Sequence, residues 1–424
     1  MKLIENLHFN NVRGDITGGI TAGVVALPFA IAMGLASGAG AIAGLYGAII
    51  TGFFAALFGG TGAQVSGPTG PMTVVMALIV TKYIAMFPET GLAIAFTTVV
   101  LGGLFQIGFG VLRLGRFINL MPHPVTSGFM TGIGVIIIIL QIPQVLGLYE
   151  IKGSTMGIFS QLSNVESYFA NTGAITIALI TLAVVYLLPK KIGKFIPSPL
   201  FALITGTLIL FFFPEFFSSE AEPLNNMILG EIPTGLPSFQ MPVWEASIIF
   251  DMAASGMMLA ILGSIDSLLT SLVSDEITRT HHKSDRELIG QGIGNTVSGL
   301  FGGLPGAGAT MRTMTNVKAG GLTPISGALH AVLLLAIVLG GAQYAQAIPL
   351  AVLGAILVKV GTDIIDWEYL KSLVSAPKSG ALIMIVVLGI TVLYNLMAAV
   401  GVGLVMASLI FLQRMTDVQL ASIV

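Results

Sequence analysis

The sequence predicts an all-α protein that crosses a membrane many times. Of its 424 residues, 55% are apolar and only 9% are charged, and the mean hydropathy is +0.95. About a quarter of the residues in a soluble domain are charged, so this chain has too few charges to cover a soluble surface of its size. Apolar runs long enough to cross about 30 Å of hydrocarbon recur along the sequence. We therefore expect lipid to be its solvent.

The composition also excludes several classes of function. The net charge of −2 provides no basic surface for nucleic acid, and the absence of Cys excludes thiol chemistry and disulfides. We find no Walker loop, no zinc-ligand spacing and no Ser/His/Asp arrangement. We therefore expect neither an enzyme nor an ATP-driven pump, and no cofactor. The first fifteen residues lack the apolar region of a cleaved signal peptide, so the first helix should be retained.

Apolar length and punctuation by Gly, Pro and charge divide the chain into fourteen candidate spans. The third and tenth each follow a Gly/Pro-rich stretch, and the tenth is too short to cross the hydrocarbon. Irregular backbone at membrane depth persists only where protein or a watery cavity satisfies its polar groups. We therefore expect two short broken helices that face a site. The spans are 16–37, 41–59, 69–86, 90–112, 123–146, 172–189, 197–213, 246–273, 286–303, 309–317, 322–341, 347–361, 380–396 and 397–414.

The distribution of basic residues predicts the orientation. With fourteen spans, 14 of the 18 Lys and Arg residues fall on the same side as both termini, and only Lys82 and Lys152 fall on the other. Cytoplasmic loops carry such an excess of basic residues. Both termini should therefore be cytoplasmic, in a cell membrane that we take to be a bacterial inner membrane.

The tetrapeptide LFGG occurs twice, at 57–60 and 300–303, each time shortly before one of the broken helices. Seven spans separate the copies, and an odd number places the two halves in opposite orientations. This pattern predicts a seven-plus-seven inverted repeat with the broken helices meeting near the middle of the membrane. Chance similarity in a chain rich in Gly and Ala is the alternative.

The starts of the broken helices predict an anion site. A helix N-terminus offers free N–H groups and a partial positive charge. Thr69 begins the first helix, and Ala309 and Thr310 begin the second. Gly306 and Gly308 would let the backbone approach a ligand. Two roles remain open for the hydroxyls of Thr69 and Thr310, capping the helix or contacting the anion.

An acidic residue inside the eighth span predicts a cation site. Asp266 lies in an otherwise apolar run, and an intramembrane carboxylate is usually functional. Thr270 is on the same helix face, and Ser267 is one position off it. These oxygen ligands suit a hard cation such as sodium, which would bind Asp266, Thr270 and backbone carbonyls near Gly308. A structural Asp, paired with Arg312 or with the backbone, is equally open.

Arg312 lies within the first turn of the tenth segment and is the chain's most unusual charge. Its guanidinium would supply fixed positive charge to the anion pocket. Pairing with Asp266 and extension to the cytoplasmic interface are the alternatives.

Three further features receive structural interpretations. We expect His281 and His282 to be solvated in a cytoplasmic loop. Glu287, Gln291 and Asn295 recur every four residues, so we expect that face to pack against the eighth span. The stretch 363–370 should form a cytoplasmic amphipathic linker.

These motifs resemble the SulP anion transporter family, which includes sulfate permeases and prestin. The resemblance covers essentially the whole chain and rests on ALPFAIAMGLASGAGAIAGLYGAI, SGPTGPMTVV, LIGQGIGN and LFGGLPGAGATM. Within the family, GSIDSLLTSLVSD is most similar to bicarbonate transporters of the BicA type. The resemblance implies substrate between the third and tenth helices and a homodimer. It also implies a core of segments 1–4 and 8–11 (about 14–112 and 246–341) and a gate of segments 5–7 and 12–14 (about 113–213 and 347–414).

The resemblance also assigns ligands. It implies sodium at Asp266 and Thr270 with contributions from Gly308 and Thr310, and an anion held by Thr69 and Ala309. Arg312 departs from the BicA-like pattern, which has Gly there, and matches prestin-like and many sulfate-type members. We expect the cytoplasmic STAS domain that usually follows in the family to be absent from this chain.

The sequence therefore predicts a secondary anion transporter, most simply a sodium symporter for bicarbonate working by an elevator movement. Its alternative is a proton-coupled symporter or an exchanger for sulfate, chloride or a dicarboxylate that uses Arg312 as a fixed charge. An anion channel or voltage-responsive motor, and a non-transporting scaffold, are the competing classes.

Overall fold

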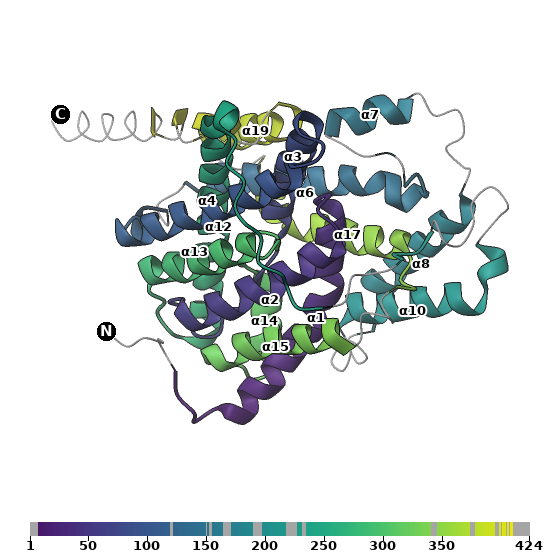
Figure 1. Cartoon of the computed structure of the whole chain (residues 1–424), viewed down its shortest axis with the longest axis horizontal. Coiled ribbons are helices and arrows are strands. Elements are labelled where there is room, and N and C mark those ends of the chain that lie inside the picture. Colours follow the sequence, from purple (N-terminus) through teal and green to yellow (C-terminus); the bar gives the residue numbers. More distant parts are fainter. Residues whose placement is uncertain are drawn as a thin grey trace.

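The computed structural model consists of α-helices and one pair of very short strands (Figure 1). The structure describes residues 7–118, 122–149, 151, 155–163, 171–189, 197–217, 227–230, 235–340, 346–373, 378–394, 398–399, 401–403, 405–406 and 408–409. Among these residues, five helices are long and apolar enough to cross a membrane, including Val12–Ala36 and His123–Leu146. With several shorter apolar helices beside them, they make the chain a multi-pass membrane protein.

Within the described residues, helices coincide with thirteen of the fourteen predicted spans, and the last span, 397–414, is only partly described. The helices are α1 (Val12–Ala36), α2 (Ala41–Phe58), α3 (Gly70–Met86), α4 (Gly91–Val111), α5 (Gly115–Ile118), α6 (His123–Leu146), α7 (Thr155–Ser163), α8 (Thr172–Leu187), α10 (Ser198–Phe212), α12 (Ile249–Thr278), α13 (Ser284–Leu300), α14 (Thr310–Lys318), α15 (Pro324–Gly340), α17 (Leu350–Ile364), α18 (Trp367–Ser372) and α19 (Lys378–Leu393), with 3-10 turns η1 (Pro214–Phe216) and η2 (Ala246–Ile248).

Glycine and proline set several of the helix boundaries. Pro71 lies in the first turn of α3, where its missing N–H leaves no gap in the hydrogen bonding. Helix α6 is followed directly by Gly147, whose φ of 76° suits glycine better than any residue with a side chain. Helix α2 is followed directly by Gly59, the third residue of the first LFGG motif.

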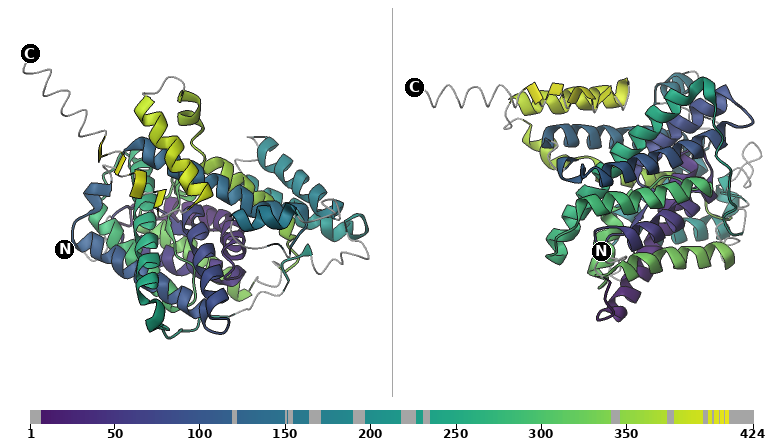
Figure 2. Two further views of the ribbon diagram at one scale, coloured as in Figure 1. Left: turned by 90° about the horizontal axis from the view of Figure 1, so that it is seen from above. Right: turned by 60° about the vertical axis from the view of Figure 1, so that its left-hand side comes forward.

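The helices pack in two groups, as Figures 1 and 2 show. In the first group, α13 lies against α2, α4 and α12, α1 and α2 lie against α15, and α14 lies against α1 and α12. In the second, α17 lies against α6 and α8, α19 lies against α6, and α10 lies against α8. Helices α1, α3 and α17 connect the groups, because α17 contacts both α1 and α3.

A two-residue strand precedes each of the broken helices, and the two strands pair with each other. Strand β1 (Ser66–Gly67) runs antiparallel to β2 (Ala307–Gly308), with Ser66 opposite Gly308 and Gly67 opposite Ala307. The amide of Ala309 extends the ladder by donating to the carbonyl of Val65 at 3.0 Å. The pair provides hydrogen-bond partners for polar backbone groups that are buried inside the protein. It brings together the starts of α3 and α14.

This pairing gives the glycines before α14 a structural role. A Cβ on Gly306 would lie 2.6 Å from the carbonyl carbon of Gly67, and a Cβ on Gly308 would lie 2.3 Å from the Gln64 amide nitrogen. The missing side chains therefore make room for the partner strand and for Gln64.

Candidate functional site

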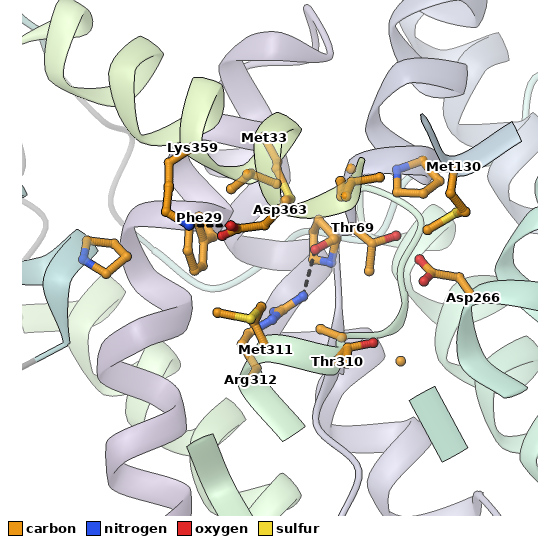
Figure 3. A pocket seen from close by; sticks show the side chains of 18 of the residues that line it. Phe29, Met33, Thr69, Met130, Asp266, Thr310, Met311, Arg312, Lys359 and Asp363 are labelled. Atoms are coloured by element: carbon orange, nitrogen blue, oxygen red, sulfur yellow. Dashed lines mark hydrogen bonds and ion pairs between the residues drawn. The ribbon is translucent and has the colours of Figure 1, made fainter. Parts of the chain in front are cut away.

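A cavity of about 330 Å³ lies between the two helix groups, at the starts of α3 and α14 (Figure 3). Met130 of α6 and Lys359 of α17 line it from the second group. The first group contributes the residues that the sequence predicted as an anion site, together with the predicted cation ligand Asp266. Those lining residues are Thr69, Gly308, Ala309, Thr310, Arg312 and Asp266.

Thr69 occupies the N-cap position of α3 with extended backbone angles, φ −122° and ψ 162°. Its side chain makes no capping hydrogen bond, and Oγ1 is buried without a partner among the described residues. The capping role considered for this hydroxyl is therefore not the one it takes. Buried hydroxyls nearly always find a partner, so Thr69 Oγ1 is free to contact a ligand in the cavity.

Arg312 lies in the first turn of α14 and is only 3% exposed, so it does not extend to an interface. Its Nη2 donates to the carbonyl oxygen of Pro68 at 2.6 Å. Its Nη1 is buried and has no partner in the described part of the chain. No ion pair joins Arg312 to Asp266 among the described residues. The guanidinium thus binds the segment before α3 through Nη2, and its Nη1 is available to donate to a ligand.

Two oxygen atoms beside the cavity lie within hydrogen-bond distance of Thr270. Its Oγ1 donates to the carbonyl oxygen of Gly308 at 2.9 Å and lies 2.8 Å from Thr310 Oγ1. Asp266 is one turn earlier on α12 and lines the cavity, and its Oδ2 is buried without a hydrogen-bond partner. Thr270 itself is fully buried behind the cavity wall. The four residues predicted for sodium therefore gather at one place and offer oxygen donors suited to a hard cation.

Ser267 contributes to the position of β2. It accepts a hydrogen bond from the amide of Gly308 at 3.1 Å, while Thr270 binds the carbonyl of the same residue. Both polar groups of Gly308 are therefore held by α12. This fixes the second strand relative to the helix that carries Asp266.

The charges around the cavity balance. Of the described lining residues, four are formally charged: two acids, Asp266 and Asp363, and two bases, Arg312 and Lys359. An anion that enters therefore adds net negative charge to a partly buried space. A cation that enters with it would restore the balance.

Lys359 and Asp363 were not predicted as site residues. The sequence assigned Asp363 to a cytoplasmic linker, but the structure places it inside α17, in an ion pair with Lys359 and on the cavity wall. The linker expectation is therefore wrong at its start, and only Trp367–Ser372 forms the separate short helix α18. The i,i+4 spacing of the two charges was the available signal.

The polar face of α13 differs from expectation, because its side chains hold the loops before both strands. Glu287 accepts hydrogen bonds from the amides of Gly60 and Thr61 at 2.9 and 3.0 Å. It also accepts from Gln64 at 2.7 Å and from Gln291 at 2.8 Å.

Further along the same helix, Gln291 donates to Ser66 Oγ in β1. Asn295 binds both the amide and the carbonyl of Gly306, at 2.7 and 2.9 Å. Helix α13 therefore positions both strands, and with them the starts of α3 and α14.

His282 also differs from expectation. It is only 6% exposed, and its Nδ1 lies 2.7 Å from Asp275 Oδ2 while its Nε2 lies 3.0 Å from Ser284 Oγ. The ring therefore ties the end of α12 to the start of α13 instead of being solvated. His281, its neighbour, is exposed as expected.

Comparison with known proteins identifies the family. The profile of the sulfate permease family matches residues 12–387. The chain belongs to the sulfate permease family. Among sulfate permease relatives, the bicarbonate transporter BicA of Synechocystis is 48% identical over 419 residues, which are 99% of this chain and 73% of that protein. The putative sulfate transporter YvdB of Bacillus subtilis is 33% identical over 381 residues, which are 88% of this chain and 68% of that protein.

Solved structures of sulfate permease relatives share the fold. The transmembrane domain of a cyanobacterial bicarbonate transporter BicA superposes with a TM-score of 0.86 at 48% identity, covering 94% of this chain and all of that domain. The murine Solute Carrier 26 family member A9 anion transporter superposes with a TM-score of 0.81 at 20% identity, covering 97% of this chain and 70% of that chain. The second likeness establishes the fold alone.

Proposed function

We propose that the chain is a secondary active anion transporter that takes up bicarbonate together with sodium. One observation carries the proposal: Thr69 Oγ1, Arg312 Nη1 and Asp266 Oδ2 are buried, lack hydrogen-bond partners and belong to residues lining one cavity. Two of these atoms suit an anion and one suits a cation. The BicA relatives at 48% identity, which are named bicarbonate transporters, support the choice of anion.

The anion would lie between the starts of α3 and α14. Both helices begin at the cavity, so their free N–H groups and dipoles favour negative charge there. The hydroxyl of Thr69 and the Nη1 of Arg312 supply directed donors. The amide of Ala309 is bonded to Val65, so Ala309 would contribute through its position at the start of α14. An unpaired buried donor costs about 1–3 kcal/mol, and an oxyanion would remove that penalty for both side chains.

Sodium would bind as a second substrate beside Asp266. The carboxylate, the two Thr hydroxyls and the Gly308 carbonyl would form an all-oxygen donor set. Thr270 Oγ1 lies within 2.9 Å of both Thr310 Oγ1 and the Gly308 carbonyl oxygen. Because the charges lining the cavity already balance, an anion alone is disfavoured and an anion with sodium is neutral. This charge balance would couple the two substrates.

The proposed transport cycle is an elevator movement. The fourteen segments would form a seven-plus-seven inverted repeat, with the core carrying Thr69 and Arg312 past the gate that carries Met130 and Lys359. The antiparallel pairing of β1 with β2 and the cavity between two helix groups support this arrangement. The proposal includes a homodimer in the inner membrane with both termini in the cytoplasm.

Uptake into proteoliposomes tests the proposal. The purified protein would be reconstituted and supplied with labelled bicarbonate or labelled sulfate, each with and without an inward sodium gradient. We expect bicarbonate uptake that rises with the gradient. Bicarbonate uptake that is unchanged when choline replaces sodium would refute sodium coupling.

A second candidate is proton-coupled uptake or exchange of sulfate, chloride or a dicarboxylate. Arg312 favours it, because a guanidinium can bind an oxyanion through two parallel hydrogen bonds and provides positive charge without sodium. The 33% identity to a putative sulfate transporter points the same way. Sulfate uptake that follows a proton gradient in the same vesicles would establish this candidate instead.

A further inference from the structure

We propose that Lys359 is a second anion-contacting residue, which meets the anion on its way to or from the site at Thr69 and Arg312. Asp363 would hold the Lys359 ammonium when no anion is present. This inference rests on the proposed anion transport and adds a contact from the second helix group to the site in the first. Figure 3 shows Lys359 and Asp363 at one end of the cavity and Asp266 at the other, with Arg312 and Thr69 between them.

The Lys359 ammonium has hydrogen-bonding capacity to spare. An ammonium group carries three donors, and in the described residues one of them binds Asp363 Oδ1. The Lys359 and Asp363 side chains are 22% and 35% exposed, and both line the cavity. The remaining donors can therefore turn to an anion without breaking the helix or moving a neighbour.

An aromatic ring restrains the position of this ammonium. Lys359 Nζ lies 5.3 Å from the centre of the Tyr186 ring, within the range of a cation–π contact. The Tyr186 hydroxyl lies 2.6 Å from Thr362 Oγ1, which fixes the ring against α17. The charge is thus held beside the cavity, where a long Lys side chain would otherwise extend freely into water.

The accessibilities of the two bases suggest an order of contact. Arg312 is 3% exposed, whereas the Lys359 side chain is 22% exposed, so an anion arriving from water reaches Lys359 more readily. Arg312 belongs to α14 and Lys359 to α17, which lie in different helix groups. A relative movement of the groups would therefore take the anion away from Lys359 while Arg312 keeps it.

Asp363 gives this contact its reversibility. A carboxylate four residues away competes with the anion for the same ammonium. The competition weakens binding at this end of the cavity and lets the anion leave. Removing Asp363 should therefore tighten the contact and slow release.

Transport kinetics of matched variants test the inference. The variants are K359Q, K359R and D363N, with K82Q as the control. Lys82 forms a similar ion pair with Asp251, 2.6 Å long, and neither residue lines the cavity. K359Q should raise the anion KM about tenfold, the loss of one charge-assisted hydrogen bond. K359R should stay within about threefold of wild type. D363N should lower both KM and the maximal rate, and K82Q should match wild type.

Two results separate this inference from the proposed function. Wild-type vesicles that move no anion refute the proposed function, and the inference falls with it. Active wild-type vesicles in which both K359Q and D363N keep the wild-type KM overturn the inference alone. Thermal unfolding in detergent shows whether each variant is folded, and if K359Q is not, D363N still decides through its KM and maximal rate.

Discussion

Arg312 donates a hydrogen bond from Nη2 to the carbonyl oxygen of Pro68 at 2.6 Å, so a side chain of α14 holds the residue just before the start of α3. The other terminal nitrogen, Nη1, has no partner among the described residues. One guanidinium therefore fixes the relative position of two helix N-termini and also offers a donor to whatever lies between them.

Replacing Arg312 should weaken anion binding strongly. Arg312→Gly removes the fixed charge and its donor, and a hydrogen bond to a charged group contributes about 1.5–3 kcal/mol. We expect the anion KM to rise by about 10- to 100-fold in proteoliposome uptake. Arg312→Lys keeps the charge but not the paired N–H donors of the guanidinium, so its anion KM should lie between those of the glycine variant and wild type. A glycine variant with wild-type affinity would show that the guanidinium serves only the Pro68 contact.

Asp266→Asn should abolish or greatly reduce the response to sodium. The amide keeps the size of the side chain but removes the charge that a cation would offset. We expect the sodium concentration for half-maximal uptake to rise at least about tenfold. Asp251→Asn is the control, because Asp251 is on the same helix but pairs with Lys82 at 2.6 Å on the protein surface. Equal sodium dependence in both variants would remove Asp266 from the cation site.

Thr69→Val should weaken anion binding without destabilising the protein, whereas Thr313→Val should destabilise it. Thr69 Oγ1 has no partner, so its loss should leave the free energy of unfolding nearly unchanged while anion KM rises about 2- to 12-fold. Thr313 Oγ1 accepts from the amide of Val65 at 3.0 Å, so its loss should destabilise the protein by about 1–3 kcal/mol. Thermal unfolding and uptake, measured on the same preparations, check both. A destabilised Thr69→Val variant would indicate a structural hydroxyl.

Gly306→Ala should disrupt the strand pair. The new Cβ would lie 2.6 to 2.8 Å from backbone atoms of Gly67, and neither strand can move without shifting a helix start. We expect a loss of at least about 2 kcal/mol in stability, with transport abolished.

Gly108→Ala is the matched control for that substitution. A Cβ at Gly108 of α4 meets nothing within 4 Å, so it should be neutral or stabilise by about 0.5–1 kcal/mol. Unfolding temperatures in detergent measure both effects. A Gly306→Ala variant as stable as wild type would mean that the strands are not tightly paired.

Much of the helical framework could be predicted from local patterns. Runs such as 123–146 are apolar, long and bounded by Pro and Gly, so hydropathy and punctuation locate them closely. The pairing of β1 with β2 could not be predicted, because two-residue strands have no periodicity and their partners lie far apart in the sequence. Gly306 illustrates the difference, since its neighbour Gly67 becomes visible only in three dimensions.

The candidate site was likewise predictable from the sequence only in part. Asp266 and the starts of the broken helices could be found because polar groups in apolar surroundings are conspicuous. The support from Glu287 and Asn295 was missed, since the sequence shows which residues share a helix face but not which segment faces them. Asp363 was missed because its charge made it resemble the start of a loop.

The strand pair also constrains how the protein is made. Gly67 pairs with Ala307, 240 positions later in the chain. At roughly 5–20 residues per second, a ribosome needs on the order of 10–50 s to synthesise the intervening segment. Throughout that interval the polar backbone of Ser66 and Gly67 must be satisfied in another way, by water, lipid headgroups or the insertion machinery. The candidate site is therefore a late product of biogenesis, completed only after most of the helices have been synthesised.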